Sequence, residues 1–161
     1  MRKILVPLDG SALSEQAIPQ AAGLARELEA SVHIVTVAPP FDAGPDMAMA
    51  GLLAGAVANP YVVTSEAGDE RSPLLRSEDY LNNLRMRLES EGVSVSYEVR
   101  VGEPVDELLA AADAQDADLI AIASHGRSGF QRAMLGSVAD ELLRRSGRPV
   151  MVIRAAQEEA P

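Results

Sequence analysis

A glycine-containing stretch, residues 120–137, holds the residue types that could bind a ligand. It reads IAIASHGRSGFQRAMLGS: an apolar run typical of a buried strand, then a loop, then the start of a helix. Glycine lets the backbone approach a ligand closely, and the free N–H groups in the first turn of a helix favour an anion. Gly126, Gly136 and Ser137 therefore predict a phosphate-binding loop, although they also fit ordinary turns and a helix cap.

Other polar side chains in the same stretch each have two interpretations. Arg127 and Arg132 could meet the charge of a phosphate, but loop arginines are more often solvated. His125 stands where a general base might be wanted. Its neighbours Ser124 and Ser128 could be nucleophiles, but residues so close in sequence rarely form a nucleophile–base pair. No acidic residue stands in the loop to orient the imidazole. We therefore expect a structural or solvated histidine.

A second polar loop follows the first apolar run, residues 3–8. In a doubly wound sheet of order 3-2-1-4-5, the first and fourth strands meet at the switch point, where ligands bind. Asp9 could there accept hydrogen bonds from a ribose or adenine, or it could form only a turn and helix cap. Pro7 could shape the site or merely end its strand. Val37 could pack on a flat base or in the core.

The motifs that accelerate phosphoryl transfer are missing. The chain has neither the sequence G-x-x-x-x-G-K-[ST] nor G-x-G-x-x-G after its first strand. Its only lysine is Lys3, which stands at the opposite end of the first strand from the predicted loop. A phosphate cradle without a lysine clamp favours binding over turnover.

The elements that must position these loops follow from the apolar pattern. Five strands, the third an alternating edge or half-exposed strand, alternate with four helices, which predicts a single-domain α/β fold over residues 1–154. The fold is a doubly wound five-stranded parallel sheet of order 3-2-1-4-5 with helices on both faces. The predicted strands are 3–8, 31–37, 93–101, 118–123 and 149–154, and the predicted helices are 14–29, 73–91, 105–114 and 138–146.

Residues 38–72 form a long connection without a clear register, which predicts a mobile loop or lid. Within it, residues 47–65 carry no charge. They barely reach the length of a membrane span and have no basic flank, so we expect a short helix that acts as a lid or a contact surface. The last residues, 155–161, predict a frayed acidic tail.

Composition excludes several classes of function. The net charge of −10 opposes binding to nucleic acid or to an anionic membrane. The absence of cysteine excludes disulfides and thiolate sites, and two histidines make a histidine-rich metal site an unattractive interpretation. The charged start is too short for a signal peptide, so a cytoplasmic location is the default expectation.

The chain resembles the universal stress protein family over nearly its whole length. ILVPLDGS near the start and ASHGRSGFQRAMLGSVADELLRRSGRPVMVIR near the end carry the resemblance. The ATP-binding branch of that family has the motif G-x2-G-x9-G-[ST], which corresponds here to Ala123, Gly126, Gly136 and Ser137. The resemblance implies a nucleotide site made of Pro7, Leu8, Asp9, Val37, Ile122, Ala123, Gly126, Arg127, Gly136, Ser137 and Val138.

The same resemblance implies ATP, or ADP or AMP, accompanied by Mg²⁺ or Mn²⁺, and a homodimer that pairs through residues 149–154. Exposed polar groups of an edge strand make such pairing physically reasonable. The chain departs from the motif at Ala123. If its backbone is extended the added methyl is tolerable, whereas positive φ or direct ligand approach would weaken binding.

The function predicted is an ATP-binding or adenine-nucleotide-binding regulatory protein of the stress response, acting with an unknown protein partner. Two alternatives remain open. The first is a nucleotide-independent dimeric interaction protein that uses residues 47–65. The second, less favoured, is a slow ATPase, for which no catalytic residue is visible in the sequence.

Overall fold

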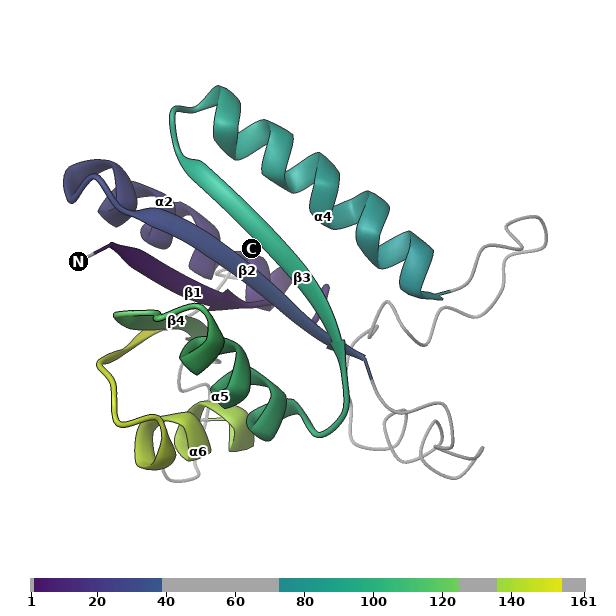
Figure 1. Cartoon of the computed structure of the whole chain (residues 1–161), viewed down its shortest axis with the longest axis vertical. Coiled ribbons are helices and arrows are strands. Elements are labelled where there is room, and N and C mark those ends of the chain that lie inside the picture. The colour runs from purple at the N-terminus through teal and green to yellow at the C-terminus, as the bar shows by residue number, and fades with distance from the viewer. Residues whose placement is uncertain (1, 39–72, 125–135, 155–161) are drawn as a thin grey trace, which may run out of the picture.

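The computed structural model describes residues 2–38, 73–124 and 136–154. Within these residues five strands form one parallel sheet in the order β3-β2-β1-β4-β5 (Figure 1). The predicted fold class and strand order are therefore confirmed, including the edge position of the third strand. The strands are β1 (Lys3–Pro7), β2 (Ser31–Ala38), β3 (Ser94–Val101), β4 (Leu119–Ser124) and β5 (Val150–Arg154).

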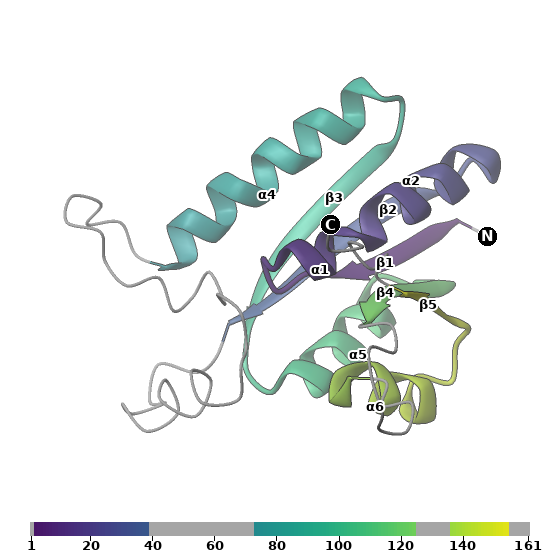
Figure 2. The same ribbon diagram turned by 180° about the vertical axis from the view of Figure 1, so that it is seen from behind.

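Helices cover both faces of the sheet (Figures 1 and 2). On one face, the helices α2 and α4 pack on a core cluster that includes Ile4, Val6 and Ile34. On the other face, α5 and α6 pack on a second cluster that includes Leu5 and Ile120. Alternate residues of β1 thus point to opposite faces, as period-two strand geometry requires. The helices are α1 (Ala12–Glu15), α2 (Ala17–Glu27), α4 (Pro73–Ser90), α5 (Pro104–Ala114) and α6 (Ser137–Arg145).

The predicted helix over residues 14–29 is confirmed in part: α2 fills most of that range, but a separate short helix, α1, precedes it. Ser11 caps α1 by accepting the N–H of Ser14, and Gln16 then separates α1 from α2. Pro19 is the third residue of α2. A proline lacks the N–H that would bond to the carbonyl of residue 15, and its ring would clash with that carbonyl in a continuous helix. The break at Gln16 places Pro19 in a first turn, where it is tolerated.

The two strands beside β1, which are β2 and β4, pair with it over different lengths. β1 pairs with β2 from Lys3 to Pro7, whereas its paired residues with β4 are Ile4 and Leu5 alone. The pairing with β2 continues at Leu8, whose N–H donates to the carbonyl of Val35 at 2.9 Å. The sheet is therefore continuous between β1 and β2 but not between the carboxyl ends of β1 and β4, which is the switch point of the strand order.

Several predictions concern residues outside the described ranges. They are the loop or lid over 38–72 beyond Ala38, the contact surface over 47–65, the tail over 155–161, and the roles of His125, Gly126, Arg127 and Arg132. Among the helices that the structure does describe, none combines the length and apolar character needed to cross a membrane.

Candidate functional site

The loop after β1 folds around the Asp9 carboxylate. Its Oδ1 accepts the backbone N–H of Ser11 at 2.9 Å and the hydroxyl of Ser11 at 2.6 Å. The N–H of Asp9 donates to the hydroxyl oxygen of Ser14 at 3.3 Å, and that hydroxyl donates to the carbonyl of Ser11 at 2.9 Å. Gly10 stands at φ +76°, a conformation that favours glycine. The turn predicted at Asp9 is therefore confirmed.

The same carboxylate is exposed to solvent and remains ionised near neutral pH. Partial burial alone would raise the pKa of Asp9. The hydrogen bonds from the side chain and backbone of Ser11 outweigh that effect and hold the pKa below its ordinary value. Both contacts from Ser11 fall on Oδ1, so neither of them uses Oδ2 of this exposed carboxylate. A turn role and a ligand role are therefore compatible at Asp9.

The first turn of α6 begins without a side-chain cap. Gly136 is the N-cap residue, at φ −52° and ψ 150°, and within residues 2–38, 73–124 and 136–154 no side chain caps the free N–H groups of the turn. The N–H of Gly136 itself points to the hydroxyl of Ser124, the buried last residue of β4, at 3.5 Å. Ser137 is the first helical residue, so the alternative that it caps the helix is wrong. Ser137 is exposed, and its N–H and hydroxyl lie next to the N–H of Val138 in the first turn.

Gly136 stands where the fold itself tolerates a larger residue. Its φ is ordinary for any amino acid, and a Cβ built on it would meet no atom of the described residues within 4 Å. The position therefore needs glycine neither for its backbone conformation nor for packing against those residues. Open space beside an uncapped helix N-terminus is the arrangement that lets an anion reach the backbone.

The loop after β1 and the N-terminus of α6 lie at the same edge of the sheet. The strands are parallel and β1 neighbours β4, so their carboxyl ends meet there. The helix α1, which ends the loop after β1, also lies against β4 (Figure 2). The structure thus brings Asp9 and Ser124 with Gly136 to the switch point, as the strand order predicted. We call Asp9–Glu15, Ser124 and Gly136–Val138 the switch-point loops.

Five further predicted residues have structural roles in this region. Pro7 is buried at the end of β1, followed by the buried Leu8. Val37 and Ile122 face the core cluster under α5 and α6, with Ile122 more deeply buried than Val37. Only Val37, which is partly exposed, keeps a surface that could contact a base. Val138 also packs partly on that cluster, so at this position its N–H is the group left for a ligand.

Ala123, which replaces a glycine of the family motif, lies within strand β4 opposite Ile153 of β5. It is not among the described residues other than glycine that have positive φ, which are Glu29 and Asp116. Its methyl packs against the core cluster beneath α2 and α4. The backbone conformation here is therefore one that alanine adopts without strain.

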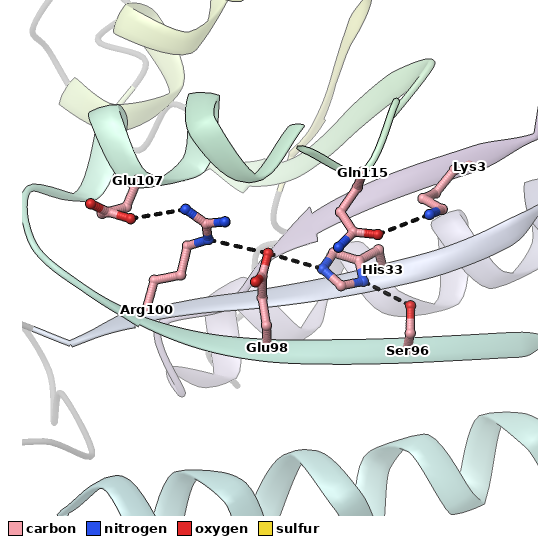
Figure 3. A network of polar contacts seen from close by, with 7 residues as sticks. All are labelled: Lys3, His33, Ser96, Glu98, Arg100, Glu107 and Gln115. Carbon is pink, nitrogen blue, oxygen red and sulfur yellow. Dashed lines mark hydrogen bonds and ion pairs between the residues drawn. The ribbon is translucent and has the colours of Figure 1, made fainter. Parts of the chain in front are cut away.

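A second polar cluster, absent from the predictions, spans β1, β2, β3 and α5 (Figure 3). His33 is only 3% exposed, and its Nδ1 lies 2.7 Å from the hydroxyl of Ser96 while Nε2 lies 3.2 Å from Oε1 of Glu98. Arg100 then bridges Glu98, at 3.2 Å, and Glu107 of α5, at 3.1 Å. Beside the imidazole, Nζ of Lys3 donates to Gln115 at 2.9 Å. We call these seven residues the histidine cluster.

The chemistry of its members fixes how the protons of the histidine cluster are shared. A carboxylate only accepts, so Nε2 of His33 carries the proton toward Glu98 and Nδ1 accepts the hydroxyl of Ser96. Burial lowers the pKa of His33, although the neighbouring Glu98 opposes the shift. Burial would raise the pKa of Glu98, but hydrogen bonds from His33 and Arg100 lower it. The ground state is thus a neutral imidazole beside an ion pair.

A signal for this cluster was present in the sequence. His33 interrupts the apolar run SVHIVTV, and Ser96, Glu98 and Arg100 alternate along one face of β3. Among the residues that the structure describes, no group of three His, Cys, Asp or Glu side chains could hold a metal ion. The cluster therefore consists of groups that pair with one another, although Nε of Arg100 is buried in an ion pair without a hydrogen bond, whereas the switch-point loops present a carboxylate and free N–H groups to the outside.

Comparisons with known proteins agree with the fold and identify the family. The model of the universal stress protein family matches residues 1–154. The universal stress protein MJ0531 of Methanocaldococcus jannaschii is 30% identical, over 98% of this chain and 85% of that protein. The universal stress protein YxiE of Bacillus subtilis is also 30% identical, over 94% of this chain and 98% of that protein.

Solved structures share the architecture. That of MJ0577 of Methanocaldococcus jannaschii superposes with a TM-score of 0.70 at 22% identity, over 98% of both chains. The structure of a universal stress protein in complex with cAMP superposes with a TM-score of 0.61 at 25% identity, over 96% of this chain and 98% of that one. The family match covers nearly the whole sequence, and this chain belongs to the universal stress protein family.

Proposed function

We propose that this protein binds an adenine nucleotide, ATP in the first place, at the switch-point loops and acts as a regulatory stress-response protein. The observation that carries the proposal is the uncapped N-terminus of α6 with Gly136 at its head. There the free N–H groups and the positive end of the helix dipole favour a phosphate. A similar protein of the family has been solved in complex with cAMP, which supports an adenine nucleotide as the ligand class.

The residues divide between the two ends of the nucleotide. The N–H groups of Ser137 and Val138 and the hydroxyl of Ser137 would hold phosphate oxygens, together with Gly126 and Arg127. Gly136, which has no side chain, would leave room for the phosphate to approach them. Asp9, ionised and exposed, would accept the ribose hydroxyls, and Val37 would offer an apolar contact for the base. The remaining members of the proposed site support these groups from the ends of β1 and β4: Pro7, Leu8, Ile122 and Ala123.

Mg²⁺ or Mn²⁺ bound with the phosphates would neutralise part of their charge. The lining described above supplies backbone donors for the phosphates, and the cation would complete the charge balance in a protein whose net charge is −10.

Binding rather than turnover is the proposed activity. Lys3, the only lysine of the chain, lies at the amino end of β1 and donates to Gln115, so it stands at the edge of the sheet opposite the switch point. A slow hydrolysis would thus proceed without a lysine clamp on the phosphates. We infer that the bound nucleotide acts as a signal, which a protein partner reads.

Homodimer formation through β5 is part of the same proposal. β5 is an edge strand, and its apolar residues Val150–Ile153 are only partly buried within one chain. An edge with unpaired backbone groups and apolar side chains is suited to pairing with a second copy. Sedimentation velocity at micromolar concentration should give a dimer, and a monomer there would contradict this part of the proposal.

Equilibrium dialysis with ATP and Mg²⁺ tests the function. The parent protein should bind, and Gly136→Val should weaken binding by about tenfold or more because the side chain occupies the space beside the helix N-terminus. Gly23→Val is the matched control. Gly23 of α2 also has ordinary φ and open space around its Cβ position, so this variant should bind as the parent does.

Either of two results would refute the proposal. One is the absence of binding by the parent at millimolar ATP. The other is equal affinity of the parent and the Gly136→Val protein, with both shown to be folded by matching urea unfolding midpoints.

A further inference from the structure

One hydrogen bond joins the long helix α4 to the loop that carries Asp9. The hydroxyl of Tyr80 donates to Oε1 of Glu15 at 2.5 Å, although the two residues are 65 positions apart. Tyr80 is half-buried, and its ring packs against the core cluster beneath α2 and α4. Glu15 is the last residue of α1. The bond therefore ties the end of α1 to a side chain anchored in the core.

α1 depends on such anchoring because it has only four residues. A single helical turn is not stable by itself in water, so its place is set by contacts with other elements. Within the loop, the N–H of Glu15 donates to the carbonyl of Ser11 at 3.2 Å. Ser11 is also the residue that holds Oδ1 of Asp9, through both its N–H and its hydroxyl. A displacement of Glu15 would thus pass through Ser11 to the Asp9 carboxylate.

We infer that Tyr80 is a positioning residue of the nucleotide site, which acts through Glu15 and Ser11 to hold the Asp9 carboxylate in place for the ribose. The inference rests on the proposed function and adds to it a residue outside the switch-point loops. The donor is suited to the task, since burial together with the Glu15 carboxylate raises the pKa of Tyr80 and keeps its hydroxyl protonated. Glu15 is thereby the acceptor at any physiological pH.

Removal of the hydroxyl alone tests the inference. Tyr80→Phe keeps the ring in the core and should lower the affinity for ATP by about three- to tenfold, the range for one lost hydrogen bond. Tyr97→Phe is the matched control. Tyr97 lies on the edge strand β3 and is likewise half-buried against the same cluster, so its variant should bind ATP as the parent does.

Variants of Glu15 separate positioning from general stability. Glu15→Gln retains an acceptor oxygen and should bind ATP within about twofold of the parent, whereas Glu15→Ala should lose as much affinity as Tyr80→Phe. The double variant Tyr80→Phe/Glu15→Ala should be no weaker than either single variant. Additive losses, or equal affinities of the parent and Tyr80→Phe proteins, would overturn the inference.

Amide hydrogen exchange of the nucleotide-free protein tests the same link without a ligand. The amides of Asp9, Ser14 and Glu15 should exchange faster in Tyr80→Phe than in Tyr97→Phe. Unchanged exchange at these amides would overturn the positioning role whatever the ligand. Faster exchange in a protein that binds no ATP would confirm the mechanical link while refuting both the proposed function and a role for Tyr80 in nucleotide binding.

Discussion

The switch-point loops and the histidine cluster are two polar regions of one sheet, and they differ in where their hydrogen bonds end. In the histidine cluster, the side chains pair with one another from Ser96 through His33 to Glu107, although Nε of Arg100 makes an ion pair and no hydrogen bond. At the switch point, the first turn of α6 has no side-chain cap and Asp9 is exposed and ionised. A closed set of polar groups supports the fold, whereas an open set is prepared for a ligand.

The comparison predicts that variants of the two regions have opposite effects. Changes in the histidine cluster should lower the free energy of unfolding without changing the affinity for ATP. Changes at Gly136 should lower the affinity for ATP without changing the free energy of unfolding. A variant of either region that altered both quantities strongly would break the comparison.

Arg100→Met should give the largest loss of stability. It removes the cation that lies between Glu98 and Glu107 and leaves two carboxylates, each less than a third exposed, without their shared partner. We expect the free energy of unfolding to fall by about 2 kcal/mol, as measured by urea titration. Arg85→Met is the control. It breaks an exposed pair with Glu89 on α4 and should cost about 0.5 kcal/mol or less.

Gly102→Ala and Gly136→Ala compare a glycine that the fold requires with one that it does not. Gly102 has φ +153°, and a Cβ there would lie 2.9 Å from Cγ of Glu107, beside the Arg100 ion pair. Gly102→Ala should therefore lower the free energy of unfolding by about 1 kcal/mol or more. Gly136→Ala should change it by less than about 0.5 kcal/mol. Equal losses in the two variants would contradict the distinction between closed and open regions.

His33→Gln should give the smallest effect, and that effect should be clearest in the pH dependence of stability. Burial holds the pKa of His33 below its ordinary value of 6.5, so the unfolded chain takes up this proton first as the pH falls. Stability from the neutral imidazole is present above pH 6.5 and is lost below it. Urea titrations between pH 7 and pH 5 should thus have a smaller slope in His33→Gln. The difference is bounded by one proton, about 1.4 kcal/mol per pH unit, and identical slopes would contradict the neutral, buried state.

Much of the fold could be predicted because local patterns and global topology agree. The β-branched runs that became β1 and β2 are continuous and apolar, as strands buried on both faces require. The switch point followed from strand order alone, and it located Asp9 and Gly136 correctly at one edge of the sheet. The split between α1 and α2 was missed because the apolar spacing predicts one helix, although the missing N–H of Pro19 is incompatible with a continuous helix from residue 14.

The histidine cluster was missed for a different reason. His33 contacts Ser96 and Glu98, which are 63 and 65 positions away, and only the register between β2 and β3 brings them together. Sequence spacing within one element cannot reveal such a pair. Ala123 is the opposite case. The sequence alone showed that an alanine replaces a motif glycine, and the extended backbone of β4 shows that alanine fits the backbone conformation there.

Mapping ATP onto the protein by two-dimensional NMR would test the central claim most directly. Titration of the labelled protein with ATP and Mg²⁺ should shift the backbone amides of the switch-point loops, above all those of Asp9, Ser124, Gly136, Ser137 and Val138. The amides of His33, Ser96, Glu98 and Arg100 should stay in place. No shifts at saturating nucleotide, or shifts centred on the histidine cluster instead, would contradict the assignment of the nucleotide to the switch point.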